Sequence, residues 1–307
     1  MKPVLDAEPS VSEKRGAQIE RILCPIDFSQ SSVRAYDYAQ SLAGHYRATL
    51  VALHIVDLAR HPAGYYAPSA PLVYDFKETL IANGQRDLQV LVKAPSGIRP
   101  ECIVQEGSPA DAILSLARER AIGLIVLGTH GRRGLDRLML GSVTERVLRN
   151  ATCPVFTVRQ TAPDSNTPDA VDHSVAIRRI LCCIDFSAHS QRALEYALSL
   201  AGAYDAELTL LHVLDDVYSA DVGKEIDTTM EKLPKLLPPA ARKSPKRHFE
   251  VRLGKAYQEI LKFAAEAQSD LIVAGMHGRQ ALDLAVFGST IYRVIQLNPG
   301  PVLAVPV

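Results

Sequence analysis

The chain of 307 residues is long for one domain and suits two domains of about 150 residues each. Hydrophobic residues make up 47% and charged residues 22%, which is ordinary for a globular protein and excludes disorder over most of the chain. Lys and Arg (34) balance Asp and Glu (34), which argues against a nucleic-acid binder that works through a large basic field.

The start of the chain and the cysteines indicate the cellular compartment and exclude further classes of protein. Residues 1–18 contain no apolar segment, so we expect a flexible N-terminus there and no secretory signal. No apolar run reaches the length of about 20 residues that spans a bilayer. Five cysteines, an odd number, do not form a disulfide framework, and no cluster has zinc-ligand spacing. These features favour a cytoplasmic protein that acts on neither membranes nor nucleic acids and holds no metal.

In chain order, the first half alternates between strands and helices. Val33, Tyr36, Ala39 and Ala43 share one face of a helix that begins near Ser29. A second helix is expected over 109–120, with Ser108 as N-cap, and a third over 143–148. Near-continuous apolar runs, typical of a parallel sheet buried on both faces, predict strands at 20–26, 49–56, 101–105, 123–128 and 154–158.

The second half repeats the first. The segments that match in register are 21–43 with 179–201, 50–57 with 208–215, and 124–132 with 271–279. The offset is 158 residues up to Asp57 and 147 from Gly107 onward, so the second copy is 11 residues shorter between them. We therefore expect two α/β domains, each an open doubly wound parallel sheet. Their expected ranges are 19–160 and 177–307, with a polar, Pro-containing linker at 161–176.

Ligands of such sheets bind at the carboxyl ends of the strands, where the strand order reverses. Asp27 and Asp185 follow the first strand of each copy. A glycine-rich segment follows the fourth strand and has one frame in both copies, Gly-x-x-Gly, nine residues, Gly-Ser. Glycine permits positive φ and close approach of backbone N–H groups to an anion, and the Gly-Ser pair precedes a helix. The pattern predicts a nucleotide cleft, although glycines needed only for the turns would give the same pattern.

These motifs resemble the universal stress protein family, as a tandem two-domain member. The resemblance rests on CPIDFS and CCIDFS, on LHIVD and LHVLD, on GTHGR and GMHGR, and on the glycine frame, and it covers about 21–158 and 179–307. It implies a five-stranded parallel sheet of order 3-2-1-4-5 in each domain, with helices on both faces. Because both copies have the glycine frame of the members that bind ATP, it also implies two sites for ATP, with or without Mg²⁺.

The resemblance carries site residues over by position. In the first copy the expected nucleotide contacts are Pro25, Ile26, Asp27, Ile55, Leu127, Gly128, His130, Gly131, Gly141, Ser142 and Val143. In the second copy they are Ile184, Asp185, Val213, Ala274, Gly275, His277, Gly278, Gly288, Ser289 and Thr290. The aspartates would contact the adenosine, Ile55 and Val213 the adenine, and the glycine frames the phosphates.

The second copy departs from the pattern at three positions. Cys183, Ala281 and Tyr292 stand where the first copy has Pro25, Gly134 and Glu145. His54 and His212 lie in apolar strands, where a hydrogen-bonded core histidine is expected. Cys24, Cys182 and Cys183 are expected to be small buried hydrophobes. The longer segment of the first copy, 57–75, is either an ordered flap or an indifferent surface loop.

Three functions remain open at this level. The leading one is an ATP-binding sensor or regulator of a stress response, with an unknown protein partner. The second is a slow Mg²⁺-dependent nucleotide hydrolase or nucleotidyl transferase, although no catalytic residue can be named from the sequence. The third is a non-nucleotide module that binds another small molecule or serves as a scaffold. The apolar final strands of the copies would pair inside the chain as a pseudo-dimer, and a homodimer of the tandem chain is left open.

Overall fold

The computed structural model describes residues 19–58, 71–92, 98–130, 140–159, 175–214, 221–277 and 288–306, with the side chains of 71–76 excepted. The expected N-terminus at 1–18, most of the linker at 161–176 and most of the longer segment at 57–75 lie outside these residues. The first repeat consists of β1 (Arg21–Pro25), α1 (Gln30–Tyr46), β2 (Thr49–Val56), α2 (Pro71–Val92), β3 (Glu101–Glu106), α3 (Pro109–Glu119), β4 (Leu124–Gly128), α4 (Ser142–Asn150) and β5 (Val155–Val158).

The second repeat has the same order of elements, with a different connection between its second and third strands. It consists of β6 (Arg179–Cys183), α5 (Ala188–Ala203), β7 (Glu207–Leu214), α6 (Val222–Lys232), the 3₁₀ helix η3 (Leu233–Leu236), α7 (Pro239–Arg242), β8 (Arg247–Leu253), α8 (Ala256–Glu266), β9 (Leu271–Gly275), α9 (Ser289–Leu297) and β10 (Val302–Val305). Among the described residues, no helix is long and apolar enough to cross a membrane.

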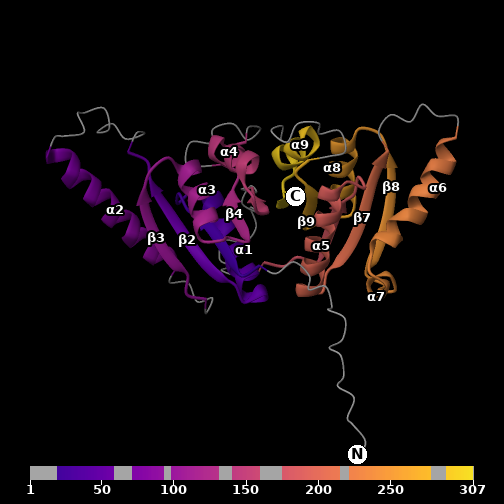
Figure 1. The fold of residues 1–307 in the computed structure, drawn as a ribbon, viewed down its shortest axis with the longest axis horizontal. Coiled ribbons are helices and arrows are strands. Elements are labelled where there is room, and N and C mark those ends of the chain that lie inside the picture. Colours follow the sequence, from indigo (N-terminus) through magenta and orange to yellow (C-terminus); the bar gives the residue numbers. More distant parts are fainter. Residues whose placement is uncertain are drawn as a thin grey trace, which may run out of the picture.

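The two repeats share one ten-stranded sheet of order β3-β2-β1-β4-β5-β10-β9-β6-β7-β8. Within each half the order is 3-2-1-4-5 and all pairs are parallel, which confirms the predicted α/β fold. Figure 1 shows the two halves facing each other across the middle of the sheet, with α2 and α6 at the two outer ends. The carboxyl ends of the strands in both halves lie on the upper side of this view.

Helices cover both faces of the sheet because the buried strands are apolar on both sides. Ile22 and Cys24 of β1 belong to the core on the face of α1, whereas Leu23 between them belongs to the core on the face of α3 and α4. Each of these two cores continues from one repeat into the other. The repeats are therefore packed together rather than joined only by the linker.

The final strands pair with each other and so cover the edges that each repeat would otherwise expose. β10 runs antiparallel to β5, with Leu303 opposite Phe156 and Val302 opposite Thr157. Leu303 and Phe156 are equivalent positions, separated by the offset of 147 residues, so a pseudo-two-fold axis passes through this pair. The hydroxyl of Thr157 donates to the carbonyl of Val302 at 3.0 Å. The expected internal pairing of the final strands is thus present.

Helices α1 and α5 meet across the same pseudo-two-fold axis. The hydroxyl of Tyr46 donates to Oγ of Ser199 at 3.1 Å, and the hydroxyls of Ser41 and Tyr204 are 2.9 Å apart. The offset of 158 residues converts Ser41 into Ser199 and Tyr46 into Tyr204, so the two contacts are copies of each other. Burial raises the pKa of Tyr204 to about 12, because the phenolate would lose its hydration in this interface.

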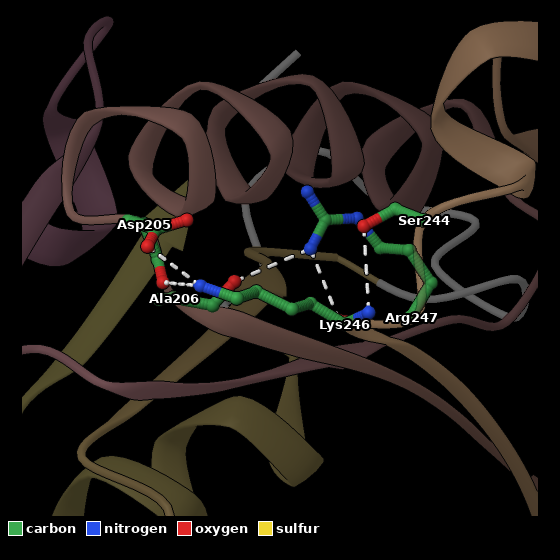
Figure 2. A network of polar contacts seen from close by, with 5 residues as sticks. All are labelled: Asp205, Ala206, Ser244, Lys246 and Arg247. Carbon is green, nitrogen blue, oxygen red and sulfur yellow. Dashed lines mark hydrogen bonds and ion pairs between the residues drawn. The ribbon is translucent and has the colours of Figure 1, made fainter.

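A polar network fixes the start of β8, the outermost strand of the second repeat (Figure 2). The ammonium group of Lys246 donates to the carbonyl of Asp205 at 2.8 Å and lies 2.6 Å from its carboxylate. Nη1 of Arg247 donates to the carbonyl of Ala206 at 3.2 Å. These contacts attach the beginning of β8 to the turn before β7. β8 therefore pairs in register with β7 although the connection before it differs from that of the first repeat.

Candidate functional site

The strand order reverses between β1 and β4 in the first repeat and between β6 and β9 in the second. β2 lies on one side of β1 and β4 on the other, and β7 and β9 flank β6 in the same way. Asp27 follows β1 and Gly128 ends β4, so the first two predicted parts of the site come from adjacent strands. Asp185 and Gly275 have the same places in the second repeat.

Each aspartate is held in place by the residue that begins the next helix. Oδ1 of Asp27 accepts hydrogen bonds from the backbone N of Ser29 at 3.0 Å and from its Oγ at 2.5 Å. Oδ1 of Asp185 accepts the same two bonds from Ser187, at 3.0 and 2.5 Å. Ser29 and Ser187 also cap α1 and α5. One carboxylate oxygen is thereby oriented by the protein, in the same way in both repeats.

The residue between the aspartate and the serine has a left-handed backbone in both repeats. Phe28 has φ 62° and Phe186 has φ 63°, a conformation that costs a bulky residue about 1 kcal/mol or more. Its ring packs on a histidine of the neighbouring strand, with centroids 4.7 Å apart for Phe28 and His54. The repeated strain points to a turn that is kept for the position of the aspartate.

The strand histidines are core residues, as expected. Nδ1 of His54 donates to the carbonyl of Ile26 at 2.7 Å, and Nδ1 of His212 donates to that of Ile184 at 2.6 Å. His212 is buried and His54 is half-buried. Each histidine therefore ties the second strand of its repeat to the chain just before the aspartate.

The four glycines of the frames that the structure describes are required for space, not for positive φ. Gly141 and Gly288 have φ −62° and −57°, and neither Gly128 nor Gly275 has a left-handed backbone. A Cβ on Gly141 would lie 2.9 Å from the carbonyl oxygen of Thr129, to which the backbone N of Gly141 donates. At Gly141 and Gly288 the chain thus lies too close to the end of the fourth strand to leave room for a side chain.

The same constraint acts at the strand ends. A Cβ on Gly128 would lie 2.5 Å from Oγ of Ser31, and a Cβ on Gly275 would lie 2.7 Å from Cβ of His189. The first turns of α1 and α5 therefore pack directly on the ends of β4 and β9. These glycines bring the helix that carries the capping serine next to the loop that follows the fourth strand.

The starts of helices α4 and α9 form the second part of each candidate site. Gly141 and Gly288 are their N-caps and, having no side chain, provide no capping hydrogen bond to the first N–H groups of the helices. The first N–H groups of a helix and its dipole favour an anion. α3 also begins without such a bond, so an uncapped start is not distinctive by itself. What distinguishes α4 and α9 is their position at the carboxyl edge of the switch-point strands.

The loop after β4 is tied to the aspartate through serines. Oγ of Ser31 donates to the carbonyl of His130 and lies 3.1 Å from Oγ of Ser29, whose own proton is donated to Asp27. Nδ1 of His130 is 2.8 Å from the hydroxyl of Thr129. Asp27 and His130, which are far apart in the sequence, are thus linked by Ser29 and Ser31.

We call the place where the first turn of the helix contacts the end of the fourth strand the corner of each repeat. The second repeat builds this corner with different side chains. His189 stands at the position of Ser31, and its ring lies 5.1 Å from that of His277, measured between centroids. Nδ1 of His277 is buried and has no hydrogen-bond partner among the described residues. Burial and the neighbouring His277 lower the pKa of His189, while Asp185 opposes them. The second site therefore has two imidazoles where the first has one.

The structure also locates the other predicted residues. Ile26, Leu127, Ile184 and Ala274 are buried at the strand ends, whereas Pro25, Ile55, Val143, Val213 and Thr290 are half-buried around them. Ser142 and Ser289 are exposed first residues of α4 and α9. Gly131 and Gly278 lie outside the described residues, as do Gly134 and Ala281, so the middle of each glycine frame is not placed.

The cysteines offer no reactive thiolate. Cys24 and Cys182 are fully buried, and burial raises the pKa of both thiols. Cys183 is raised to a pKa of about 12 by burial and by the charge of Asp185. Within the described ranges no three His, Cys, Asp or Glu side chains are placed to hold a metal ion.

Sequence reasoning missed the serines and the histidine that build the corner: Ser29, Ser31, Ser187 and His189. Ser29 and Ser187 could have been predicted from the sequence Asp-Phe-Ser, which both copies contain. In this pattern the serine can cap a helix and hydrogen-bond to the aspartate. The substitution of His189 for Ser31 was visible in the aligned repeats. Its meaning needed the structure, because only the fold brings α5 against β9.

Comparison with known proteins covers nearly the whole chain. A family model described as the universal stress protein family matches residues 18–159 and 176–306. The chain is 26% identical over 297 residues to a universal stress protein of Mycolicibacterium smegmatis, with 92% of this chain and 96% of that protein aligned. It is 34% identical over 143 residues to one of Methanocaldococcus jannaschii, with 46% of this chain and 82% of that protein aligned.

Solved structures show the same fold. The crystal structure of a universal stress protein from Archaeoglobus fulgidus superposes with a TM-score of 0.69 at 24% sequence identity, over 94% of this chain and 99% of that one. Both halves of the chain thus match one fold and one sequence family.

Proposed function

The chain belongs to the universal stress protein family, and from that premise we propose that it is an ATP-binding regulator or sensor of a stress response, with one nucleotide site in each repeat. One observation carries the proposal. In each repeat an oriented carboxylate and a helix start with glycine as its N-cap both lie at the carboxyl edge of the two switch-point strands. A hydrogen-bond acceptor for a sugar and a cluster of N–H donors for phosphate are what a nucleotide requires.

The residues present fit the chemical groups of ATP. Asp27 and Asp185 would accept hydrogen bonds from the ribose hydroxyls, and the half-buried Ile55 and Val213 would line the adenine. The backbone N–H groups at the starts of α4 and α9 would hold the phosphates, together with any Mg²⁺ that ATP brings. We further propose that the protein acts in the cytoplasm, where ATP is available, and that bound nucleotide changes its affinity for a protein partner.

The first test is the nucleotide content of the freshly purified protein. The protein is denatured, and the released small molecules are separated and compared with nucleotide standards. We expect about two adenine nucleotides per chain, or about one if only one repeat retains its ligand. Recovery of ADP in place of ATP would favour the slow hydrolase. Recovery of neither, followed by no binding when ATP is titrated, would contradict the proposal and favour the non-nucleotide module.

A charge placed at the helix start tests the phosphate position without disturbing the fold. Ser142→Glu puts a carboxylate on the first residue of α4, where it stabilises the helix and repels a phosphate. Because Ser142 is exposed, the substitution meets no packing constraint. We expect ATP affinity in the first site to fall at least tenfold while the melting temperature stays the same or rises.

Ser289→Glu is the matched change for the second site, and the double variant should bind no ATP. Isothermal titration calorimetry of the three variants assigns each binding event to a repeat. Unchanged affinity in the double variant would mean that the phosphates, if bound at all, lie elsewhere.

A further inference from the structure

A groove lies between the two repeats, on the face of the sheet that α3, α4, α8 and α9 cover. Its volume is about 450 Å³, which is within the range of small-molecule sites. Figure 1 shows α4 and α9 facing each other on either side of the junction. Residues from both repeats line the groove, chiefly Glu145 and Arg149 of α4, Ser289, Tyr292 and Arg293 of α9, and Tyr257 of α8.

The groove breaks the pseudo-two-fold symmetry of the chain at an arginine. Arg146 of α4 forms an ion pair with Asp111 of α3 at 2.5 Å. The equivalent of Arg146 is Arg293, but the equivalent of Asp111 is Gln258, which has no charge. Arg293 therefore has no counterpart of this ion pair. Its guanidinium lies over the ring of Tyr257, 4.7 Å from the centroid.

The amide of Gln258 supports this arrangement. Its Nε2 donates to the hydroxyl of Tyr257 at 3.1 Å, so the residue that replaces the acid holds the ring on which Arg293 lies. The guanidinium of Arg149 is occupied, because it donates to Oε1 of Glu145 at 2.9 and 3.2 Å. Since that pair is balanced, the described lining residues carry one positive charge, that of Arg293, which no carboxylate among them neutralises.

The walls combine this charge with apolar and aromatic surface. Tyr257 and Tyr292 are half-buried, and Leu297 at the other end of α9 leaves 41% of its surface exposed. Ser289 brings the start of α9, and hence the positive end of its dipole, to the rim of the groove. A planar ring between the tyrosines and an anionic group on Arg293 would satisfy both features.

We propose that this groove binds a small aromatic carboxylate. The carboxylate accepts a bidentate hydrogen bond from Arg293, and the ring packs against Tyr257 and Tyr292. The site adjoins the second nucleotide cleft at Ser289, the first residue of α9, but its arginine and tyrosines are not nucleotide contacts. It belongs to the tandem chain as a unit, because α4 and α9 come from different repeats. It is also specific to the second repeat's arginine, since Arg146 is held by Asp111.

The probe for the test is 2-naphthoate, titrated into the full-length protein by isothermal titration calorimetry. We expect one molecule bound per chain. Arg293→Gln should weaken binding about tenfold, the effect of losing one charge-assisted contact. The matched change Arg146→Gln should alter affinity by less than twofold. The neutral analogue 2-naphthalenemethanol should bind at least tenfold more weakly to the unmodified protein.

A second variant keeps the test decisive if Arg293→Gln fails to fold. Gln258→Asp rebuilds the ion pair of the first repeat and should weaken 2-naphthoate binding while retaining the arginine. Absence of binding at the solubility limit, or equal losses from Arg293→Gln and Arg146→Gln, overturns the proposal. ATP titrations of the same variants should be unchanged, so failure of the groove and failure of the nucleotide sites are read separately.

Discussion

The two repeats use one backbone frame at their strand ends and fill it with different side chains. In both, a serine orients the aspartate and a glycine lets the first turn of the next helix contact the fourth strand. In the first repeat this contact involves the hydroxyl of Ser31, which donates to the carbonyl of His130. In the second it involves Cβ and the backbone of His189, whose imidazole packs on that of His277.

The difference continues at the start of the last helix. Thr144 donates through its hydroxyl to the carbonyl of Gly128 at 2.9 Å. Its equivalent, Ile291, makes no such bond and lies in the core with 3% of its surface exposed. The first corner is thus connected by hydroxyl groups, and the second by apolar packing and imidazoles. The repeats have in common the backbone geometry and the close approach at the glycines. The side chains that would face a ligand differ between them.

The shared frame can be broken equally in both repeats. Gly128→Ala and Gly275→Ala each force a Cβ to within 2.5–2.7 Å of the neighbouring helix. We expect each to lower the free energy of unfolding by about 2–3 kcal/mol, as overpacking does. Denaturant unfolding followed by far-UV circular dichroism measures the change.

The control for this prediction is a glycine with open surroundings. A Cβ on Gly202, in α5, would meet no atom within 4 Å. Gly202→Ala should therefore stabilise the protein by about 0.5–1 kcal/mol, the helix preference of alanine over glycine. A loss confined to one of the two strand-end variants would show that the frame is not shared as described.

The pseudo-symmetric contacts of α1 and α5 sharpen the comparison where the repeats should be equivalent. Tyr46→Phe and Tyr204→Phe each remove one of the two matched hydrogen bonds with Ser199 and Ser41. We expect a loss of about 1 kcal/mol from each, read as a lower melting temperature. Tyr46→Phe combined with Ser199→Ala should cost less than the sum of the single changes, because both remove the same bond.

An outcome in which one tyrosine matters and the other does not would show that the two contacts are unequal. Tyr204 offers a reason for such a result, since its ring also lies 4.0 Å from that of His45, between centroids. The equivalent of His45 in the second repeat is Ala203, so Tyr46 has no matching ring contact.

Much of the fold followed from the sequence because its signals are local or repeated. The strands expected at 49–56 and 123–128 are β2 at Thr49–Val56 and β4 at Leu124–Gly128, and Ser29 and Ser108 precede α1 and α3 as expected. A continuous apolar run bounded by turn residues predicts a buried strand without any knowledge of the rest of the fold. The strand order was predicted from the family resemblance. Because the second half repeats the first, the same order was expected in both repeats.

The site was less predictable because its contacts join distant segments. The spacing of the frame indicated that Gly141 matters, but its reason is the carbonyl of Thr129, which only the folded loop brings within 2.9 Å of an added Cβ. The groove between the repeats was even less predictable than the glycine contacts. It depends on Gln258 replacing Asp111, a change that carries no meaning until α8 and α9 are seen together.

The smallest expected effect concerns His189, the residue that separates the two corners. Burial and His277 lower its pKa, so the folded protein takes up a proton there less readily than the unfolded chain, whose histidines titrate near 6.5. As the pH falls through 6.5, the unfolded state gains the proton first and the stability of the protein decreases. Of the titratable groups near the ring, Asp185 opposes this effect and His277 adds to it.

His189→Ser installs the residue of the first repeat and removes this contribution. The melting temperature of the variant should therefore fall less than that of the unmodified protein between pH 8 and pH 5. His189→Gln, which keeps a larger polar side chain without titrating, separates the proton from the packing and should behave as His189→Ser does. Parallel pH profiles for all three proteins would mean that the imidazole pair does not titrate with folding, and that the two corners differ in shape alone.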